Sequence, residues 1–147
     1  MNVPANIVVY TVDKPFDVAR RQLLRAFELE GLRVPHELDT SARVKSELGV
    51  GLRKSVVLYV DDPILLLEAT VMTAAGGLFI PEPVSLSEKD RGCRVSVRSI
   101  QPFYGSGLPA SLRTAGTDLH ERILAAIQRV GQKETAATVP APSAVAV

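Results

Sequence analysis

Apolar residues follow two kinds of pattern along this chain, and each pattern predicts a different kind of element. Residues 6–12 (NIVVYTV) and 54–60 (KSVVLYV) are nearly unbroken runs of β-branched and other apolar residues, which is typical of buried strands. Residues 93–98 (CRVSVR) alternate strictly between apolar and polar positions. This alternation predicts an antiparallel strand with one buried face and one polar face.

Three longer segments space their apolar residues three and four positions apart, as amphipathic helices do. They cover residues 16–31, 63–73 and 118–130. The predicted inward-facing residues are Phe16, Ala19, Leu23, Ala26 and Phe27 in the first, Leu65, Leu66, Ala69 and Met72 in the second, and Leu119, Ile123, Ala126, Ile127 and Val130 in the third.

The ends of the first two helices carry their own signals. Asp17 is expected to cap the first helix, and Gly31 is expected to end it. Asp62 before Pro63 predicts the start of the second, because a carboxylate caps free amides and proline loses no hydrogen bond at the first helical position. The pair of glycines at residues 76–77 is expected to end this helix.

A short helix and two further strands complete the predicted elements. Residues 32–38 alternate like a strand, but Pro35 removes a backbone donor and predicts an edge position. Residues 40–48 predict a short helix that starts at Thr40 or Ser41. Residues 78–86 follow the glycine pair at once and predict a fourth strand, in which two prolines flank Glu82. We expect this Pro-Glu-Pro step to shape an edge or a seam of the sheet.

The predicted order is β-α-β-α-β-α-β-β-α. It indicates an α+β protein in two layers, with a mixed, mostly antiparallel sheet of about five strands and helices packed on one face. We expect residues 1–131 to form a single domain. Residues 132–147 are rich in alanine and proline and lack bulky apolar residues, which predicts a flexible tail.

Composition excludes several classes of function. The formal charge is +1 and aromatic residues make up 5% of the 147 residues, which argues against a nucleic-acid partner. Cys93 is the only cysteine, so neither an internal disulfide nor a cysteine-based metal site is possible. No apolar run approaches the roughly 20 residues of a membrane helix, and the start of the chain lacks the features of a signal peptide. We therefore expect a cytoplasmic protein without a membrane partner.

Two acidic residues are candidates for ligand binding. Glu82 is the first, because the prolines on either side fix the backbone that carries its carboxylate. Asp61 is the second, since with Glu68 or Glu82 it could offer oxygen ligands to a divalent cation. No spacing resembles a calcium-binding loop, so we predict no metal site and assign Asp62 to helix capping.

Arg94 and Arg98 complete the set of candidate ligand-binding residues. They share the polar face of the strand at residues 93–98, where they could hold a small anionic ligand or acidic residues of a second subunit. Cys93 falls on the opposite face, and a buried cysteine usually packs as a small apolar residue.

The remaining motifs do not indicate a cofactor. His36 and His120 are the only histidines, and with one cysteine on a separate element they make a poor set of zinc ligands. We expect His120 on the surface of its helix. The segment YGSGLP at residues 104–109 lacks the Walker lysine and the spacing of a dinucleotide-binding loop, which predicts a plain loop.

The succession of these motifs resembles the bacterial and archaeal family called domain of unknown function 302. The matching pieces are a helix that ends in glycine at residues 27–32, a polar strand and short helix at residues 36–48, an apolar strand that runs into Asp-Pro at residues 62–63, and Gly-Leu-x-x-Pro at residues 77–81. The resemblance implies a compact α+β fold of the TATA-binding-protein-like type and a homodimer, and it implies no established reaction. Many relatives place one cysteine after the proline of the Gly-Leu-x-x-Pro motif and another before Asn-Pro, where this chain has Glu82 and either Asp61 or Val60, so thiol chemistry does not carry over.

Three hypotheses for the function follow. The leading one is a non-catalytic homodimeric module that binds a small ligand or serves as an accessory protein. The second is a hydrolase or redox accessory enzyme that uses Glu82 with Asp61 or Cys93. The third, nucleic-acid binding through the sheet, is disfavoured by the near-neutral charge and the scarcity of aromatic residues.

Overall fold

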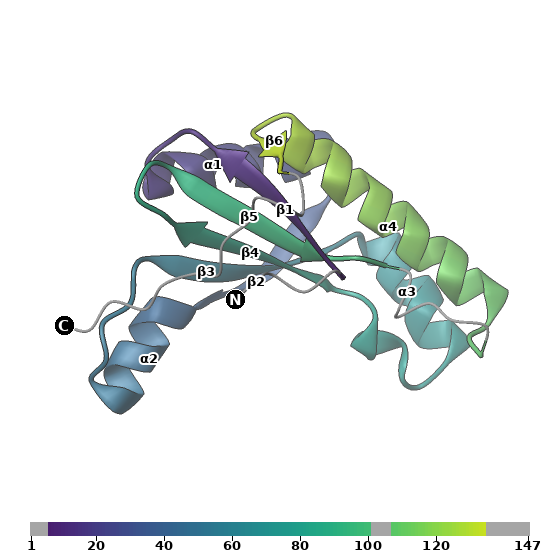
Figure 1. Cartoon of the computed structure of the whole chain (residues 1–147). Helices are drawn as coiled ribbons and strands as arrows, with labels where there is room; N and C mark the ends of the chain where they lie inside the picture. Colours follow the sequence, from purple (N-terminus) through teal and green to yellow (C-terminus); the bar gives the residue numbers. More distant parts are fainter. Residues whose placement is uncertain (1–5, 101–106, 135–147) are drawn as a thin grey trace.

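The computed structural model of the chain describes residues 6–100 and 107–134 (Figure 1). In chain order the elements are β1 (Ile7–Val12), α1 (Phe16–Leu29), β2 (Arg33–Asp39), α2 (Thr40–Leu48), β3 (Ser55–Asp61), α3 (Pro63–Met72), the 3-10 turn η1 (Gly76–Leu78), β4 (Glu82–Glu88), β5 (Cys93–Arg98), α4 (Ala110–Gln128) and β6 (Gln132–Lys133). The part of the chain with YGSGLP lies largely outside the described residues.

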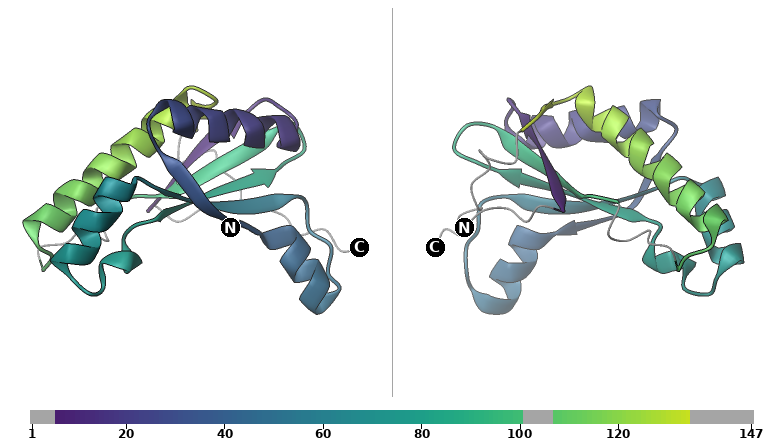
Figure 2. Two further views of the ribbon diagram at one scale, coloured as in Figure 1. Left: turned by 180° about the vertical axis from the view of Figure 1, so that it is seen from behind. Right: turned by 45° about the vertical axis from the view of Figure 1, so that its right-hand side comes forward.

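The strands form one six-stranded sheet in the order β2-β3-β4-β5-β1-β6. Every pairing is antiparallel, whereas the prediction allowed for a mixed sheet of about five strands. Helices α1, α3 and α4 cover one face (Figures 1 and 2), and α2 extends away from the sheet and buries none of its residues. The predicted α+β class with helices on one face is therefore confirmed.

The sixth strand was not predicted. Gln132 and Lys133 pair with Thr11 and Tyr10 of β1, and the amide of Glu134 donates a hydrogen bond of 2.8 Å to the carbonyl of Val9. The sheet thus continues past residue 131, where the domain was expected to end. The rest of the predicted tail lies outside the described residues.

The core lies between the sheet and the covering helices. Alternation along the strands places one set of apolar residues toward the helices, namely Val56, Leu58 and Val60 of β3, Val84 and Leu86 of β4, and Cys93, Val95 and Val97 of β5. They meet Ala19, Leu23, Ala26 and Phe27 of α1 and the inner residues of α4. The strict alternation predicted for residues 93–98 is confirmed, since the three apolar residues are buried and the three polar ones are half-buried.

Two predictions about the fourth strand were wrong. The strand begins at Glu82 rather than at residue 78, because residues 76–78 form η1 and Leu78 is 75% exposed. Moreover, β4 lies between β3 and β5 in the interior of the sheet, so the Pro-Glu-Pro step does not protect an edge. The peptide bond between Ile80 and Pro81 is cis. By contrast, β2 with Pro35 is an edge strand, as predicted, and its register shifts between Arg33 and His36.

Several helix ends also differ from the prediction. α1 follows Pro15 and receives no side-chain cap from Asp17, and α2 is capped by Asp39, which accepts a hydrogen bond of 2.8 Å from the amide of Ala42. α4 begins at Ala110, eight residues earlier than expected. The capping of α3 by Asp62 is confirmed, with 2.8 Å between Oδ1 and the amide of Ile64.

Among the helices that the structure describes, none combines the length and the apolar character needed to cross a membrane. The most apolar of them, α3, has ten residues. Its Leu65 and Ala69 are buried as predicted, whereas Met72 is 43% exposed and does not face the core.

The close packing of η1 on α3 gives a testable consequence. A Cβ at Gly76 would overlap with the backbone carbonyl of Ala69, whereas a Cβ at Gly77 would meet no atom. Gly76→Ala is therefore expected to lower the free energy of unfolding by about 2 kcal/mol or more. Gly77→Ala, the matched control, should change it by less than about 1 kcal/mol and should tend to stabilise. Urea unfolding of both variants measures the difference, and equal stabilities would contradict the packing.

Candidate functional site

Glu82 and His120 form a buried pair between the sheet and α4. Glu82 is the first residue of β4 and, like Val84 and Leu86, points toward the helices. His120 lies in the middle of α4, and its Nδ1 is 2.7 Å from Oε1 of Glu82. Their residues are only 8% and 6% exposed, respectively. A carboxylate this deeply buried needs a hydrogen-bonding partner, and His120 supplies it.

The prediction that His120 lies on the surface was wrong. It belongs to the inner stripe of α4, together with Gly116, Leu119 and Ile123. These positions follow the helical spacing of three and four residues, but the predicted helix began too late for the stripe to be recognised. A helix extended to Ala110 would have placed His120 toward the core.

Asp61 and Asp62 lie beside this pair, where β3 runs into α3. Val60 is opposite Glu82 in the sheet, and Asp61 is opposite Arg33. Burial and the neighbouring charge of Asp62 raise the pKa of Asp61 above its ordinary value, although Arg33 opposes this effect. Asp61 is therefore a carboxyl group in an unfavourable environment for its charged form.

Asp62 has the opposite environment. Burial alone would raise its pKa, but hydrogen bonds from the Arg122 guanidinium and the amide of Ile64 outweigh burial and lower the pKa of Asp62. Arg122 Nη1 is 2.8 Å from Asp62 Oδ2, and Nη2 donates to the carbonyl of Glu30 at 2.8 Å. Arg122 thus ties α4 to the start of α3 and to the end of α1.

The four predicted ligand-binding residues do not share one site. Glu82 lies on the helix-covered face of the sheet with His120, and Asp61 lies at the adjoining end of β3. Arg94 and Arg98 point to the opposite face, where both are half-buried; Arg94 is opposite Thr11 and Arg98 is opposite Ile7 of β1. Arg94 also faces an acidic group, since its Nε is 3.6 Å from Oε1 of Glu134.

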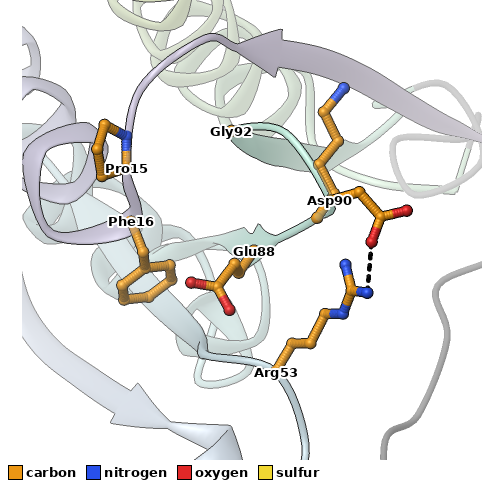
Figure 3. A pocket seen from close by; sticks show the side chains of 7 residues that line it. Pro15, Phe16, Arg53, Glu88, Asp90 and Gly92 are labelled. Atoms are coloured by element: carbon orange, nitrogen blue, oxygen red, sulfur yellow. Dashed lines mark hydrogen bonds and ion pairs between the residues drawn. The ribbon is translucent and has the colours of Figure 1, made fainter.

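A cleft of about 350 Å³ opens at the other end of the sheet (Figure 3). It lies where the start of α1, the segment before β3 and the β4–β5 turn come together. Its lining is polar and charged apart from the start of α1, and it consists of Pro15, Phe16, Arg53, Glu88, Lys89, Asp90 and Gly92. Glu88 points into the space between Phe16 and Arg53, and Arg53 forms an ion pair with Asp90.

Gly92 sets the shape of this cleft. Its φ of +83° lies in the left-handed region, and a Cβ at this position would overlap with the carbonyl of Val12. The β4–β5 turn can therefore approach the β1–α1 connection only with glycine here. The residues of the cleft come from segments far apart in the sequence, and no local motif marks them, which is why sequence analysis did not find this site.

Cys93 lies close to the cleft but within the core. It is fully buried, as predicted, and its thiol is 3.5 Å from the carbonyl of Lys14. Burial, together with the charge of Glu88, raises the pKa of the thiol to about 11. Because the thiolate is the reactive form, both the burial of Cys93 and its raised pKa disfavour a role as a nucleophile. In the part of the chain that the structure describes, no three His, Cys, Asp or Glu residues are grouped to hold a metal ion.

Fold and site together define an α+β module with a buried acid–imidazole pair and an open charged cleft. The family model for the domain of unknown function DUF302 matches residues 7–130. The chain therefore belongs to this family, and the resemblance seen in the sequence is confirmed.

Among solved structures, the chain is similar to the uncharacterized conserved protein DUF302 from Bacillus stearothermophilus. The two share 15% sequence identity with a TM-score of 0.75, over 86% of this chain and 99% of that one. At this identity the similarity shows the fold alone. No curated protein matches the chain.

The opposite environments of Asp61 and Asp62 predict opposite pH dependences. The raised pKa of Asp61 means that its carboxyl group binds a proton more tightly in the folded state than in the unfolded state. The stability that the protonated carboxyl group contributes is therefore lost as the pH rises through the pKa of the folded state. The lowered pKa of Asp62 means that its contribution is present at neutral pH and is lost as the pH falls through the folded pKa.

We therefore expect Asp61→Asn to stabilise the protein relative to the wild type at pH 7, with the difference shrinking toward pH 3. Asp62→Asn should destabilise at pH 7, and this difference should also shrink toward pH 3. Urea unfolding across this pH range measures both differences. The same sign for both variants at pH 7 would contradict the assigned environments.

Proposed function

We propose that the protein is a non-catalytic, homodimeric module that binds a small anionic ligand in the cleft of Figure 3. The observation that carries this proposal is the position of Arg53, a cation in an open cleft that forms an ion pair with the highly exposed side chain of Asp90. The free thiol of Cys93 fits a reducing compartment such as the cytoplasm.

The exchange of one anion for another on Arg53 costs little. The side chain of Asp90 is 86% exposed and that of Arg53 is 35% exposed, and ion pairs of this kind contribute about 1 kcal/mol or less. A carboxylate or phosphate group can accept two hydrogen bonds from a guanidinium, and the cleft has room for a small molecule beyond that group. Arg53 is therefore suited to release Asp90 and bind a ligand of this class.

Lys89 adds a second positive charge to the cleft. Its Nζ is 3.4 Å from the hydroxyl of Thr11 and 3.9 Å from Glu134 Oε1, so it is held on the side of the cleft toward β1. Glu88 supplies a negative charge to the same lining. This combination favours a small ligand that carries an anionic group together with a polar or cationic group over a polyanion such as nucleic acid.

The reactive side chains support binding rather than chemistry. Glu82 and His120 satisfy each other within the core, and the thiol of Cys93 has a raised pKa. Cys93 is opposite Glu88, which lies at the far end of β4 from Glu82. Because a strand rises a little more than 3 Å per residue, Cys93 and Glu82 are about 20 Å apart. An enzyme that used both residues in one site would need them much closer.

A thermal-shift screen tests this proposal with a panel of small carboxylates, amino acids and inorganic phosphate. Calorimetry then measures the affinity of each compound that stabilises the protein. At least one member is expected to raise the melting temperature of the wild type. Arg53→Ala should weaken its binding about tenfold or more. Asp90→Asn should strengthen it about twofold to fivefold, because it removes the competing carboxylate.

Arg25→Ala is the matched control, since Arg25 forms an exposed ion pair with Glu28 on α1. It should leave the binding unchanged. No stabilisation by any member of the panel, or a shift that Arg53→Ala leaves intact, would contradict the proposed site.

A further inference from the structure

Helix α3 is apolar over most of its surface, although the residues that the structure describes cover only one side of it. Leu65 and Ala69 face the core, and α3 packs against α4 at one end of the molecule (Figures 1 and 2). On its other side Ile64, Leu67 and Val71 are between 61% and 68% exposed. A helix that is apolar all round is normally buried. The exposed apolar side of α3 is therefore expected to be a contact surface, either for another part of the chain or for another molecule.

The spacing of the exposed residues suits a second helix. Ile64, Leu67 and Val71 follow one another at intervals of three and four residues, which is the spacing of the a and d positions that pack one helix against another. Of the residues of α3, only Glu68 carries a charge.

We infer that this face, defined by Ile64, Leu67 and Val71 with Met72 and Leu78 beside them, is the homodimer interface, and that its occupant is α3 of a second copy. The inference rests on the homodimer in the proposed function and adds the surface that forms it. In a two-fold dimer the same patch meets itself, so the two α3 helices lie antiparallel with Leu67 nearest the axis. Glu68 is exposed on the same side of α3, one position from Leu67, and would lie at the flank of the contact. The net charge of +1 gives two copies little mutual repulsion over longer distances.

The area of the patch fits the apolar centre of such an interface. Full burial of a large aliphatic side chain removes about 100 Å² of apolar surface from water. Five residues that are 43–75% exposed thus offer about 300 Å² per copy by the same measure. A standard interface buries about 800 Å² per partner, of which somewhat more than half is apolar. The patch supplies most of this apolar part, and the polar residues around it form the rim.

The C-terminal residues of the chain are a less suitable occupant. Residues 135–147 (TAATVPAPSAVAV) contain no leucine, isoleucine, methionine or aromatic residue and carry two prolines. They lack the large side chains that fit between the residues of a helix face, and proline disfavours a matching helix. A second α3 meets both requirements.

Sedimentation velocity of the full chain over a range of concentrations tests the inference. The wild type is expected to be a dimer at micromolar concentration, and Leu67→Glu to shift the dissociation constant upward at least 100-fold, because it places two like charges next to the two-fold axis. Leu48→Glu is the matched control, since Leu48 is a leucine of α2 that is 73% exposed. It should leave the dimer intact.

Cross-linking gives a second readout that does not depend on destabilising the interface. Cys93 is the only cysteine and is buried with a raised pKa, so a cysteine introduced at the surface will react selectively. Leu67→Cys is expected to form a disulfide-linked dimer under mild oxidation, whereas Leu48→Cys should not.

The outcomes separate the inference from the proposed function. A wild-type dimer that survives Leu67→Glu, with no cross-link through Leu67→Cys, would overturn the assignment of the interface and leave the homodimer standing. A wild-type monomer at all concentrations would overturn both. Binding of the anionic ligand to the Arg53 cleft is measured independently, and neither outcome alters its test.

Discussion

The docking of α4 on the sheet has to bring His120 to Glu82, because neither polar group can be buried cheaply without the other. A carboxylate buried at the start of a central strand is costly unless a partner reaches it, and only a residue on the helix layer can do so. The partner is in the middle of α4, so this requirement constrains the position of α4 across the sheet and its rotation about its own axis, together with the apolar residues of the same stripe. The inner stripe from Leu112 to Ile127 then falls onto the strands.

The same docking of α4 determines how the other helices are held. Arg122 follows His120 by two residues and therefore points to a different side of α4, where it reaches Asp62 at the start of α3 and the carbonyl of Glu30 at the end of α1. Seven residues further along, Arg129 binds the side chain of Glu30 at 2.8 Å. One helix thus secures two junctions of the chain, the end of α1 and the start of α3, through Glu30 and Asp62.

The features concerned with packing and the proposed ligand-binding cleft lie at opposite ends of the sheet. One end contains the buried pair, the Asp62–Arg122 contact and the apolar face of α3, all of which concern packing of helices or of subunits. The other end contains the β4–β5 turn, whose glycine at position 92 lets the cleft form next to Arg53. Arg94 and Arg98 lie on the face of the sheet opposite the helices, and Arg94 faces the same carboxylate, Glu134, as Lys89 of the cleft. The proposed ligand binding and the proposed subunit contact therefore involve separate residues and can be changed separately.

Much of the fold could be predicted from the sequence because it is encoded locally. Alternation identified β5, Asp-Pro identified the start of α3, and Pro35 identified an edge strand. The start of β4 was missed because Leu78, Phe79 and Ile80 form an apolar run like that of a strand, while the packing of Gly76 on Ala69 makes the chain turn there. The pairing of Glu82 with His120 spans 38 residues and that of Arg53 with Asp90 spans 37, so no pattern of neighbouring residues could reveal either.

A double-mutant cycle on Glu82 and His120 tests the account most directly. Glu82→Leu and His120→Leu should each lower the free energy of unfolding by about 3 kcal/mol, because each leaves the other polar group buried without its partner. The double variant should recover about half or more of the combined loss and should bind the ligand of the Arg53 cleft as tightly as the wild type. Single variants as stable as the wild type, or a double variant whose losses simply add, would contradict the claim that this pair positions α4 on the sheet.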